Sequence, residues 1–378
     1  MKPESLSNGM NAGAGVALMA GCLICLGLIM VASASMDVAA AQYGNPFYFF
    51  ERHLVYILIG LITAWGVYQV PMTLWQHISS QVFVFGLVLL ALVLVPHVGR
   101  RVNGSMRWLG VGPLTMQPSE VAKLCVVLFL SAYLVRRQDE VRETWAGLIK
   151  AGVVLLLVAV LLLAEPDFGA TFVLMLTAAA MILLAGSGLK RFITSTVVLI
   201  GAGVVMAMSR SYRVQRLTAY IHPWVHPFDQ GYQLTQSLIA FGRGGWAGAG
   251  LGNSVQKLFY LPEAHTDFVF AVFAEEFGLL GVSVVIAMFM ALVLMGLRIG
   301  HWAESKGQYY NAYVAYGLSI LIGVQASVNI GVTSGALPTK GLTLPLVSYG
   351  GSSLVVELIM VALLLRVHRE SNTAGART

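Results

Sequence analysis

The sequence predicts an all-α polytopic membrane protein with about ten transmembrane helices. Of its 378 residues, 57% are hydrophobic and only 11% are charged. A single core cannot bury that much apolar surface, so lipid must cover a large part of it. Apolar stretches of about 16 to 20 residues recur along the chain, which is the length that a helix needs to cross a bilayer. The bilayer is therefore expected to be the solvent of this protein.

Uncharged apolar stretches give the positions of the ten helices. They lie near residues 16–34, 54–70, 80–96, 121–135, 147–164, 168–186, 191–208, 268–297, 312–334 and 346–366. One membrane domain, 16–366, is thus expected between tails at 1–15 and 367–378, with a long loop at 209–266 between the seventh and eighth helices. Because the number of helices is even, both termini should lie on the same side.

The distribution of lysine and arginine predicts which side that is, because cytoplasmic short loops carry an excess of both. If the termini are cytoplasmic, the opposite short loops hold only Arg52 and Lys340. The cytoplasmic side then collects Lys2, Arg136, Arg137, Arg142, Lys150, Lys190, Arg191, Arg298, Lys306, Arg366, Arg369 and Arg377. We therefore expect both termini in the cytoplasm.

The two longest outward segments, 97–123 and 209–266, carry basic residues against this preference. These are Arg100, Arg101, Arg107, Lys123, Arg210, Arg213, Arg216, Arg243 and Lys257. An anionic ligand would compensate for their charge. Pairing with Glu120, Asp229, Glu263 and lipid phosphates is the alternative. The aromatic residues of 209–266 suit a lid that lies at the depth of the lipid headgroups.

The first candidate site opens the fourth helix, at Pro118-Ser119-Glu120 and Lys123. Glu120 suits the positive end of a helix dipole, and Lys123 lies one turn further on the same face. Just before it, Arg107 and Trp108 place a guanidinium beside an indole, a pair that can hold a phosphate and a neighbouring ring. Helix capping explains the glutamate and serine equally well.

The second candidate site closes the long loop, at 262–268. A carboxylate at a membrane mouth, as at Asp267, can have a raised pKa and serve as a general base. Its position would equally suit a helix cap, and His265 suits a hydrogen-bonding neighbour. Glu275 and Glu276 follow inside the eighth helix, where packing against a cation or polar backbone is at least as good an explanation as function.

The third candidate site is the glycine-, proline- and serine-rich stretch 337–353, which includes Lys340 and Ser348. Membranes tolerate irregular backbone only where protein or a watery cavity satisfies it, so this stretch is expected to line the same cavity. A plain turn is the alternative. The glycine-rich stretch 242–250 lacks the lysine and serine of a nucleotide-binding loop, which disfavours ATP as a substrate. The three cysteines lie in predicted helices and suit packing.

Together these motifs resemble the SEDS family of peptidoglycan polymerases, from about Ser33 to Ser353. The resemblance rests on 103–108, 118–120, 166–169, 231–233, 265–268 and 348–353. The stretches 261–267 and 337–341 are more similar to the division members of the family than to its elongation members. The resemblance therefore implies a ten-helix enzyme of the bacterial inner membrane that acts at the division septum.

The resemblance also implies a reaction and a set of site residues. Family members join lipid II, a disaccharide peptide on undecaprenyl pyrophosphate, into glycan strands with inversion and without ATP. By position, Asp267 would be the catalytic carboxylate. The residues assigned to substrate binding are Arg107, Trp108, Glu120, Lys123, Arg210, Arg213, Arg216, His265, Lys340 and Ser348. A divalent cation, Mg²⁺ or Mn²⁺, could assist at the pyrophosphate, with no protein ligands assigned.

The resemblance implies protein partners as well, and two other functions compete with it. Family members work with a class B penicillin-binding protein, a transpeptidase, and with other division proteins; no nucleic acid is expected. The alternatives are a flippase that moves lipid II across the bilayer and a scaffold that only recruits the transpeptidase. A flippase needs charged residues along a route to the cytoplasm, of which the apolar spans offer few. A scaffold would tolerate loss of the outward cations.

Overall fold

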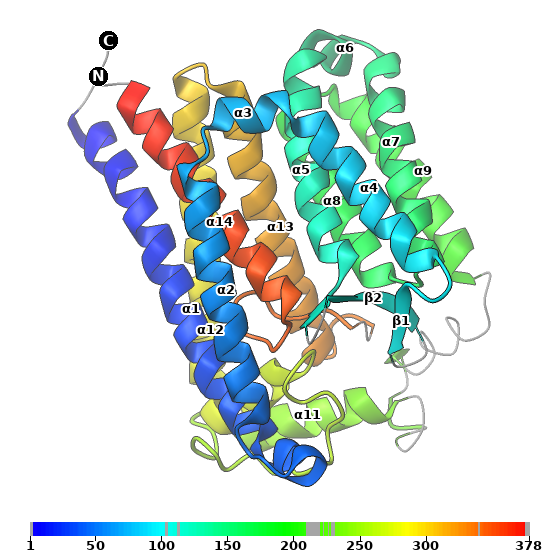
Figure 1. The fold of residues 1–378 in the computed structure, drawn as a ribbon, viewed down its shortest axis with the longest axis vertical. Helices are drawn as coiled ribbons and strands as arrows, with labels where there is room; N and C mark the ends of the chain where they lie inside the picture. The colour runs from blue at the N-terminus through cyan, green and yellow to red at the C-terminus, as the bar shows by residue number, and fades with distance from the viewer. Residues whose placement is uncertain are drawn as a thin grey trace.

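The computed structural model describes residues 3–374 apart from 103–104, 112–113, 209–219, 222, 226, 228–230 and 339–340. It is a bundle of helices with a small sheet at one end (Figure 1). The helices are α1 (Pro3–Tyr43), α2 (Tyr48–Gln69), α3 (Met72–His77), α4 (Ser79–Leu94), α5 (Pro118–Arg136), α6 (Gln138–Glu143), α7 (Trp145–Ala164), α8 (Phe168–Leu184), α9 (Leu189–Met208), α11 (Tyr232–Gly244), α12 (Val269–Ser305), α13 (Tyr309–Thr333) and α14 (Ser352–Ala374). The strands are β1 (Gly99–Val102), β2 (Ser105–Val111) and β3 (Leu114–Met116).

Helices occupy all ten predicted positions, as α1, α2, α4, α5, α7, α8, α9, α12, α13 and α14. In the part of the chain that the structure describes, α1, α2, α5, α7, α12 and α13 are long and apolar enough to cross a membrane, while α4 and α8 are apolar but shorter. The start of α1 and the end of α14 lie at the same end of the bundle, where Gly13 packs against His368. We call this the termini end, and the opposite end, with the strands and α11, the loop end.

Several predicted boundaries were wrong. Both segments predicted as tails are partly helical, because α1 begins at Pro3 and α14 continues to Ala374. The last helix begins at Ser352 rather than near 346. The backbone at Leu346 (φ 63°) and Gly351 (φ 51°) lies in the left-handed region, which a right-handed helix cannot include. The stretch 346–351 therefore stays irregular inside the protein.

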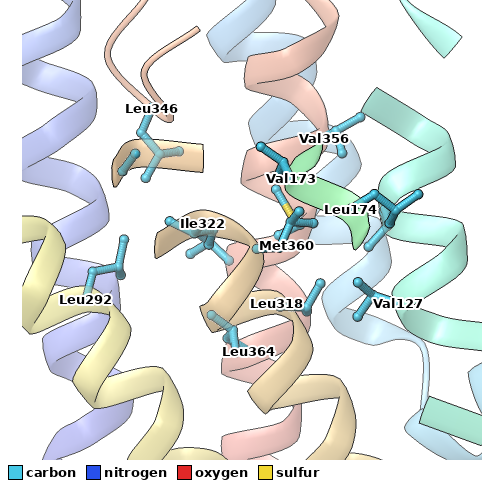
Figure 2. Packing of buried hydrophobic residues seen from close by; sticks show 14 of the residues in the cluster. Val127, Val173, Leu174, Leu292, Leu318, Ile322, Leu346, Val356, Met360 and Leu364 are labelled. Carbon is cyan, nitrogen blue, oxygen red and sulfur yellow. The ribbon is translucent and has the colours of Figure 1, made fainter. Parts of the chain in front are cut away.

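The core lies between α5, α13 and α14. Most residues of α5 and α13 are buried, whereas most of the apolar stretches of α1, α2, α7 and α12 are not. Val127 of α5, Leu318 of α13 and Met360 of α14 lie together in this core (Figure 2). The exposed side chains on the outer helices are large and apolar, for example Ile62 of α2 and Leu280 of α12. Such a surface matches a lipid environment.

Two features at the loop end were not predicted from the sequence. The segment 97–117 forms an antiparallel sheet in the order β1-β2-β3, and Leu109 of β2 packs against Leu89 and Val93 of α4. Helix α12 is kinked at Gly278, where φ is 64° and the backbone of Gly248 lies so close that a Cβ would reach its nitrogen at 2.4 Å. Only glycine fits this approach.

Candidate active site

Asp267 ends the loop that leads into α12, and it is half-buried at the loop end. It does not cap α12, whose first turn follows Phe268 without a side-chain cap. Asn329 of α13 fixes its backbone by donating to the carbonyl oxygens of Asp267 (2.8 Å) and Leu342 (2.6 Å). A Cβ at Gly341 would lie 2.7 Å from Oδ2 of Asp267. The carboxylate thus lies close to the backbone of Gly341, while the cavity that the sequence predicted for this stretch stays a prediction.

The surroundings of Asp267 raise its pKa to about 7, mainly through burial. The negative charge of Glu263 acts in the same direction, the guanidinium of Arg107 opposes it, and Asp167 adds a smaller effect that raises the pKa. These three groups come from three separate segments of the chain. A carboxylate with a pKa near neutral can take up a proton during catalysis.

Arg107 is positioned by the turn between α7 and α8. Its Nε donates to the carbonyl oxygen of Glu165 (3.1 Å) and its Nη2 to that of Pro166 (2.5 Å). Pro166 has a φ of 30°, far from the usual proline value, so the turn is strained where it holds the guanidinium. Arg107 therefore belongs to the cluster around Asp267, whereas its predicted role in substrate binding stays a prediction.

The same turn carries two buried carboxyl groups that the sequence did not assign to the site. Asp167 caps α8 by accepting from the backbone nitrogen of Ala170 (3.1 Å), and it also accepts from Ser119 Oγ (3.0 Å) and Gln117 Nε2 (3.1 Å). Glu165 is fully buried, and neither of its carboxyl oxygens has a hydrogen-bond partner in the described part of the chain. Burial, and then the charge of Asp167, raise the pKa of Glu165 to about 8.

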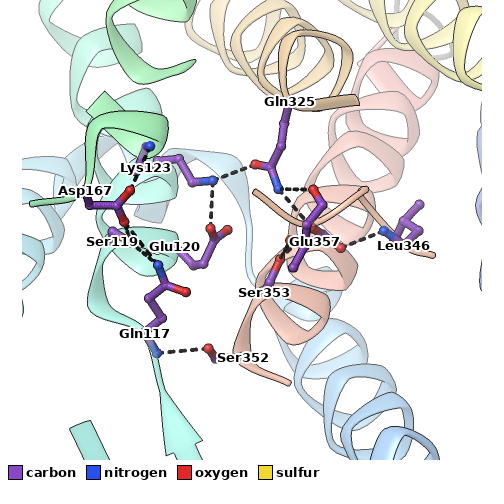
Figure 3. Close-up of polar contacts among 12 residues, drawn as sticks. Gln117, Ser119, Glu120, Lys123, Asp167, Gln325, Leu346, Ser352, Ser353 and Glu357 are labelled. Carbon is purple, nitrogen blue, oxygen red and sulfur yellow. Dashed lines mark hydrogen bonds and ion pairs between the residues drawn. The ribbon is translucent and has the colours of Figure 1, made fainter. Parts of the chain in front are cut away.

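Glu120 and Lys123 lie inside the bundle rather than at an open surface. They form an ion pair of 2.9 Å in which both side chains are almost fully buried. Lys123 also donates to Gln325 of α13 (2.5 Å), which in turn contacts Glu357 of α14 (Figure 3). Their predicted role in substrate binding therefore stays a prediction, and their contacts give them a structural role.

Glu357 closes this network on the other side. It accepts hydrogen bonds from Ser353 Oγ (2.7 Å) and from the backbone nitrogen of Leu346 (2.7 Å). Ser352 meanwhile accepts from the backbone nitrogen of Gln117 (Figure 3). In the irregular stretch 346–351, the buried carboxylate thus satisfies the backbone nitrogen of Leu346, while those of Val347, Ser348 and Tyr349 donate to backbone carbonyl oxygens, as membrane proteins require.

The remaining predicted site residues fall into three groups. Ser348 is buried and accepts from the backbone nitrogen of Leu344, and His265 packs its ring against Phe49 at 4.4 Å, so both support the loops around Asp267. Trp108 is half-buried in β2, beside Arg107. The other four, Arg210, Arg213, Arg216 and Lys340, lie outside the described residues.

Besides Lys123, two of the outward cations in the described part of the chain form ion pairs within the protein. Arg243 pairs with Glu275 (2.9 Å) and Lys257 pairs with Glu276 (2.9 Å). The alternative of pairing with Glu120, Asp229 or Glu263 is confirmed for Lys123, which pairs with Glu120. Arg243 and Lys257 pair within the protein as well, but with partners that this alternative did not name. The partners were two glutamates of the eighth helix, which the sequence assigned to packing against a cation or backbone.

Besides Asp167, four residues of the site were missed as members of it: Glu165, Gln325, Asn329 and Glu357. Glutamate, glutamine and asparagine within apolar stretches carry a sequence signal, because an unsatisfied polar group is costly there. That signal marks them as buried and partnered. It does not say that all of them converge on the loops around Asp267.

Comparisons with known proteins fit this arrangement. The profile of the family described as "Cell cycle protein", which covers FtsW, RodA and SpoVE, matches residues 14–373. The chain belongs to this family. It is 52% identical over 98% of its length to a probable peptidoglycan glycosyltransferase FtsW of Pseudomonas fluorescens, covering 92% of that protein. It is 49% identical over 92% of its length to the FtsW of the same description in Coxiella burnetii, covering 94% of it. The predicted family and its division branch are confirmed.

Solved structures of relatives share the fold. A structure described as "Structural coordination of polymerization and crosslinking by a peptidoglycan synthase complex" matches with a TM-score of 0.76 and 28% identity, over 94% of this chain and 97% of that one. The rod shape determining protein RodA of Thermus thermophilus matches with a TM-score of 0.67 and 27% identity, over 94% and 96%. The all-helical membrane fold is therefore confirmed.

Proposed function

We propose that this chain is a peptidoglycan glycosyltransferase that polymerises lipid II during cell division, with Asp267 as its general base. The observation that carries the proposal is the cluster at the loop end. There a half-buried carboxyl group with a pKa of about 7 lies in the field of Arg107 and against the exposed backbone of Gly341. The names of the FtsW relatives support the same activity.

In the proposed reaction, Asp267 takes the proton of the acceptor sugar's 4-hydroxyl as that oxygen attacks the anomeric carbon of the donor. The new glycosidic bond forms while the bond from that carbon to the pyrophosphate breaks. Undecaprenyl pyrophosphate leaves with the bonding electrons, and the configuration at the carbon inverts. Arg107 supplies positive charge near the developing negative charge, where a fixed cation stabilises a transition state most.

The topology proposed with this function has ten spans, with the loop end outside the cytoplasm. The helices at all ten predicted positions and the shared end of α1 and α14 support it. Lipid II would reach the site from the outer leaflet of the plasma membrane, at the septum. The similar synthase complex is described as coordinating polymerisation with crosslinking, which supports a class B penicillin-binding protein as the partner.

A divalent cation stays a proposal without protein ligands. In the described ranges, no group of three or more histidine, cysteine or acidic side chains is arranged to hold a metal. We therefore assign no step to a metal. An ion that arrives with the pyrophosphate would show itself as a dependence of polymerisation on added Mg²⁺ or Mn²⁺.

The test is polymerisation by the purified chain with its partner, whose transpeptidase is inactivated, on labelled lipid II. Asp267→Asn should lower the rate by at least about 100-fold, because a general base contributes that much or more. Asp139→Asn, in α6 at the termini end, is the matched control and should leave the rate unchanged. Polymerisation at the wild-type rate by Asp267→Asn would refute the base.

The same preparation separates the two rival functions. A flippase would move labelled lipid II across liposomes without forming polymer. A scaffold would bind the transpeptidase, and its Asp267→Asn variant would support division in cells as well as the wild type.

A further inference from the structure

A groove with a volume of about 810 Å³ opens between α1, α2 and the loop that follows α11. This volume lies within the range of about 300 to 1,000 Å³ that is usual for ligand sites. Its walls are mainly apolar, with side chains from all three segments. They include Leu28, Ile29 and Met36 of α1, Phe50 of α2, and Leu251 and Leu258 of the loop.

The loop wall of the groove is held firmly to α12. The carboxylate of Glu275 accepts from Ser254 Oγ (2.5 Å) and from the backbone nitrogens of Val255 (3.1 Å) and Gln256 (3.2 Å). Arg243 of α11 pairs with the same carboxylate. Because one buried carboxylate fixes three successive residues, the groove is formed before any ligand arrives.

One polar corner of the groove carries the positive charge of Lys257, and Glu276 neutralises that charge. Lys257 Nζ contacts Glu276 Oε1 and Ser33 Oγ, each at 2.9 Å, and Ser33 donates to the same carboxylate oxygen at 2.8 Å. A phosphate or sugar would have to compete with these contacts. The groove therefore offers mainly apolar walls to a ligand, and its other charged lining residue is Asp37, which is exposed on α1.

The groove and the candidate active site share two structural elements. The loop that forms its wall continues from Leu258 directly to Asp267. On α2, Phe50 lines the groove, while the adjacent Phe49 packs against His265, two residues before Asp267. The groove and the candidate base thus lie on the same loop and beside the same turn of α2.

We propose that this groove binds the polyprenyl chain of one of the two lipid-linked substrates. The inference rests on the proposed function. When polymerisation begins, both reactants carry such a chain, and each chain must remain in apolar surroundings while the sugars meet at Asp267. A preformed apolar groove next to the site meets this need for one of them.

The experiment uses undecaprenyl phosphate with a photoreactive diazirine in its chain, added to the purified full-length protein in phospholipid nanodiscs. After irradiation, labelled peptides are identified by mass spectrometry. Label should appear in residues 28–37 and 251–258, and excess unlabelled undecaprenyl phosphate should remove it. Ala32→Trp and Leu251→Trp fill the groove from opposite walls, and each should reduce this label at least about tenfold.

The control is Leu18→Trp, which adds the same bulk to an exposed position of α1 that does not line the groove, and its labelling should match the wild type.

Unchanged labelling in both groove variants would overturn the proposal. So would equal displacement by added phosphatidylethanolamine, which would show that the groove holds bulk lipid. Polymerisation of lipid II by the wild type is measured separately. Its absence would refute the proposed function, whereas its presence without groove labelling would refute only this inference.

Discussion

The pH dependence of polymerisation is the most direct test of the raised pKa of Asp267. With a pKa of about 7, about a tenth of the carboxyl groups are ionised at pH 6 and about nine-tenths at pH 8. A general base acts in its ionised form, so kcat/KM should rise about tenfold between these two values. An aspartate with the ordinary pKa of 3.8 would be ionised throughout, and the profile would be flat.

Two variants test the cause of this shift, because they act on it in opposite directions. Glu263→Gln removes a negative charge that raises the pKa of Asp267, so the midpoint of the profile should move to lower pH. Arg107→Gln removes a positive charge that lowers the pKa, so the midpoint should move to higher pH. Glu263→Gln keeps the size of the side chain, and Arg107→Gln leaves a shorter polar one.

The assay is the initial rate of polymer formation from labelled lipid II at low concentration, from about pH 5.5 to about pH 8.5. Total protein and the inactivated partner are held constant, and each preparation is returned to neutral pH to check that activity recovers. A flat profile in the wild type would refute the reasoning. So would a midpoint that moves the same way in both variants.

Three further predictions concern groups around the site. Gly341→Ala should displace the carboxylate of Asp267 and reduce the rate of polymerisation by about 10- to 100-fold. The control is Gly242→Ala in α11, which has open space around it and should keep the wild-type rate. Equal rates in the two variants would contradict the prediction. Lys123→Met should lower the free energy of unfolding by about 3 to 5 kcal/mol, because it leaves Glu120 buried and unpaired. The double variant Glu120→Met/Lys123→Met should restore thermal stability. If the double variant also regains full polymerisation, a role of these two residues in substrate binding is excluded. The pKa of Glu165 is about 8 in the folded protein against an ordinary 4.5, so the wild type loses stability as pH rises between these values. The melting temperature of Glu165→Gln should therefore exceed that of the wild type by an amount that grows over this range. A difference that stays constant with pH would contradict this.

The sequence by itself determined the class of protein and the position of its helices. A chain of this hydrophobicity must be solvated by lipid, and uncharged stretches of spanning length are local features that need no tertiary information. The motif around Asp267 and the arginine at 107 were likewise visible as short segments. Their convergence was expected only because the motifs resemble a family.

Tertiary structure decided which charges meet. Arg243 and Lys257 find their partners in Glu275 and Glu276, and the burial of Glu165 depends on how the turn after α7 packs. In the non-helical stretch 346–351, the backbone nitrogen of Leu346 bonds to the carboxylate of Glu357 in α14. Hydropathy and local propensity describe neighbours along the chain, whereas these pairs join segments far apart in it. Only the packed bundle brings them within the few ångströms over which hydrogen bonds and burial act.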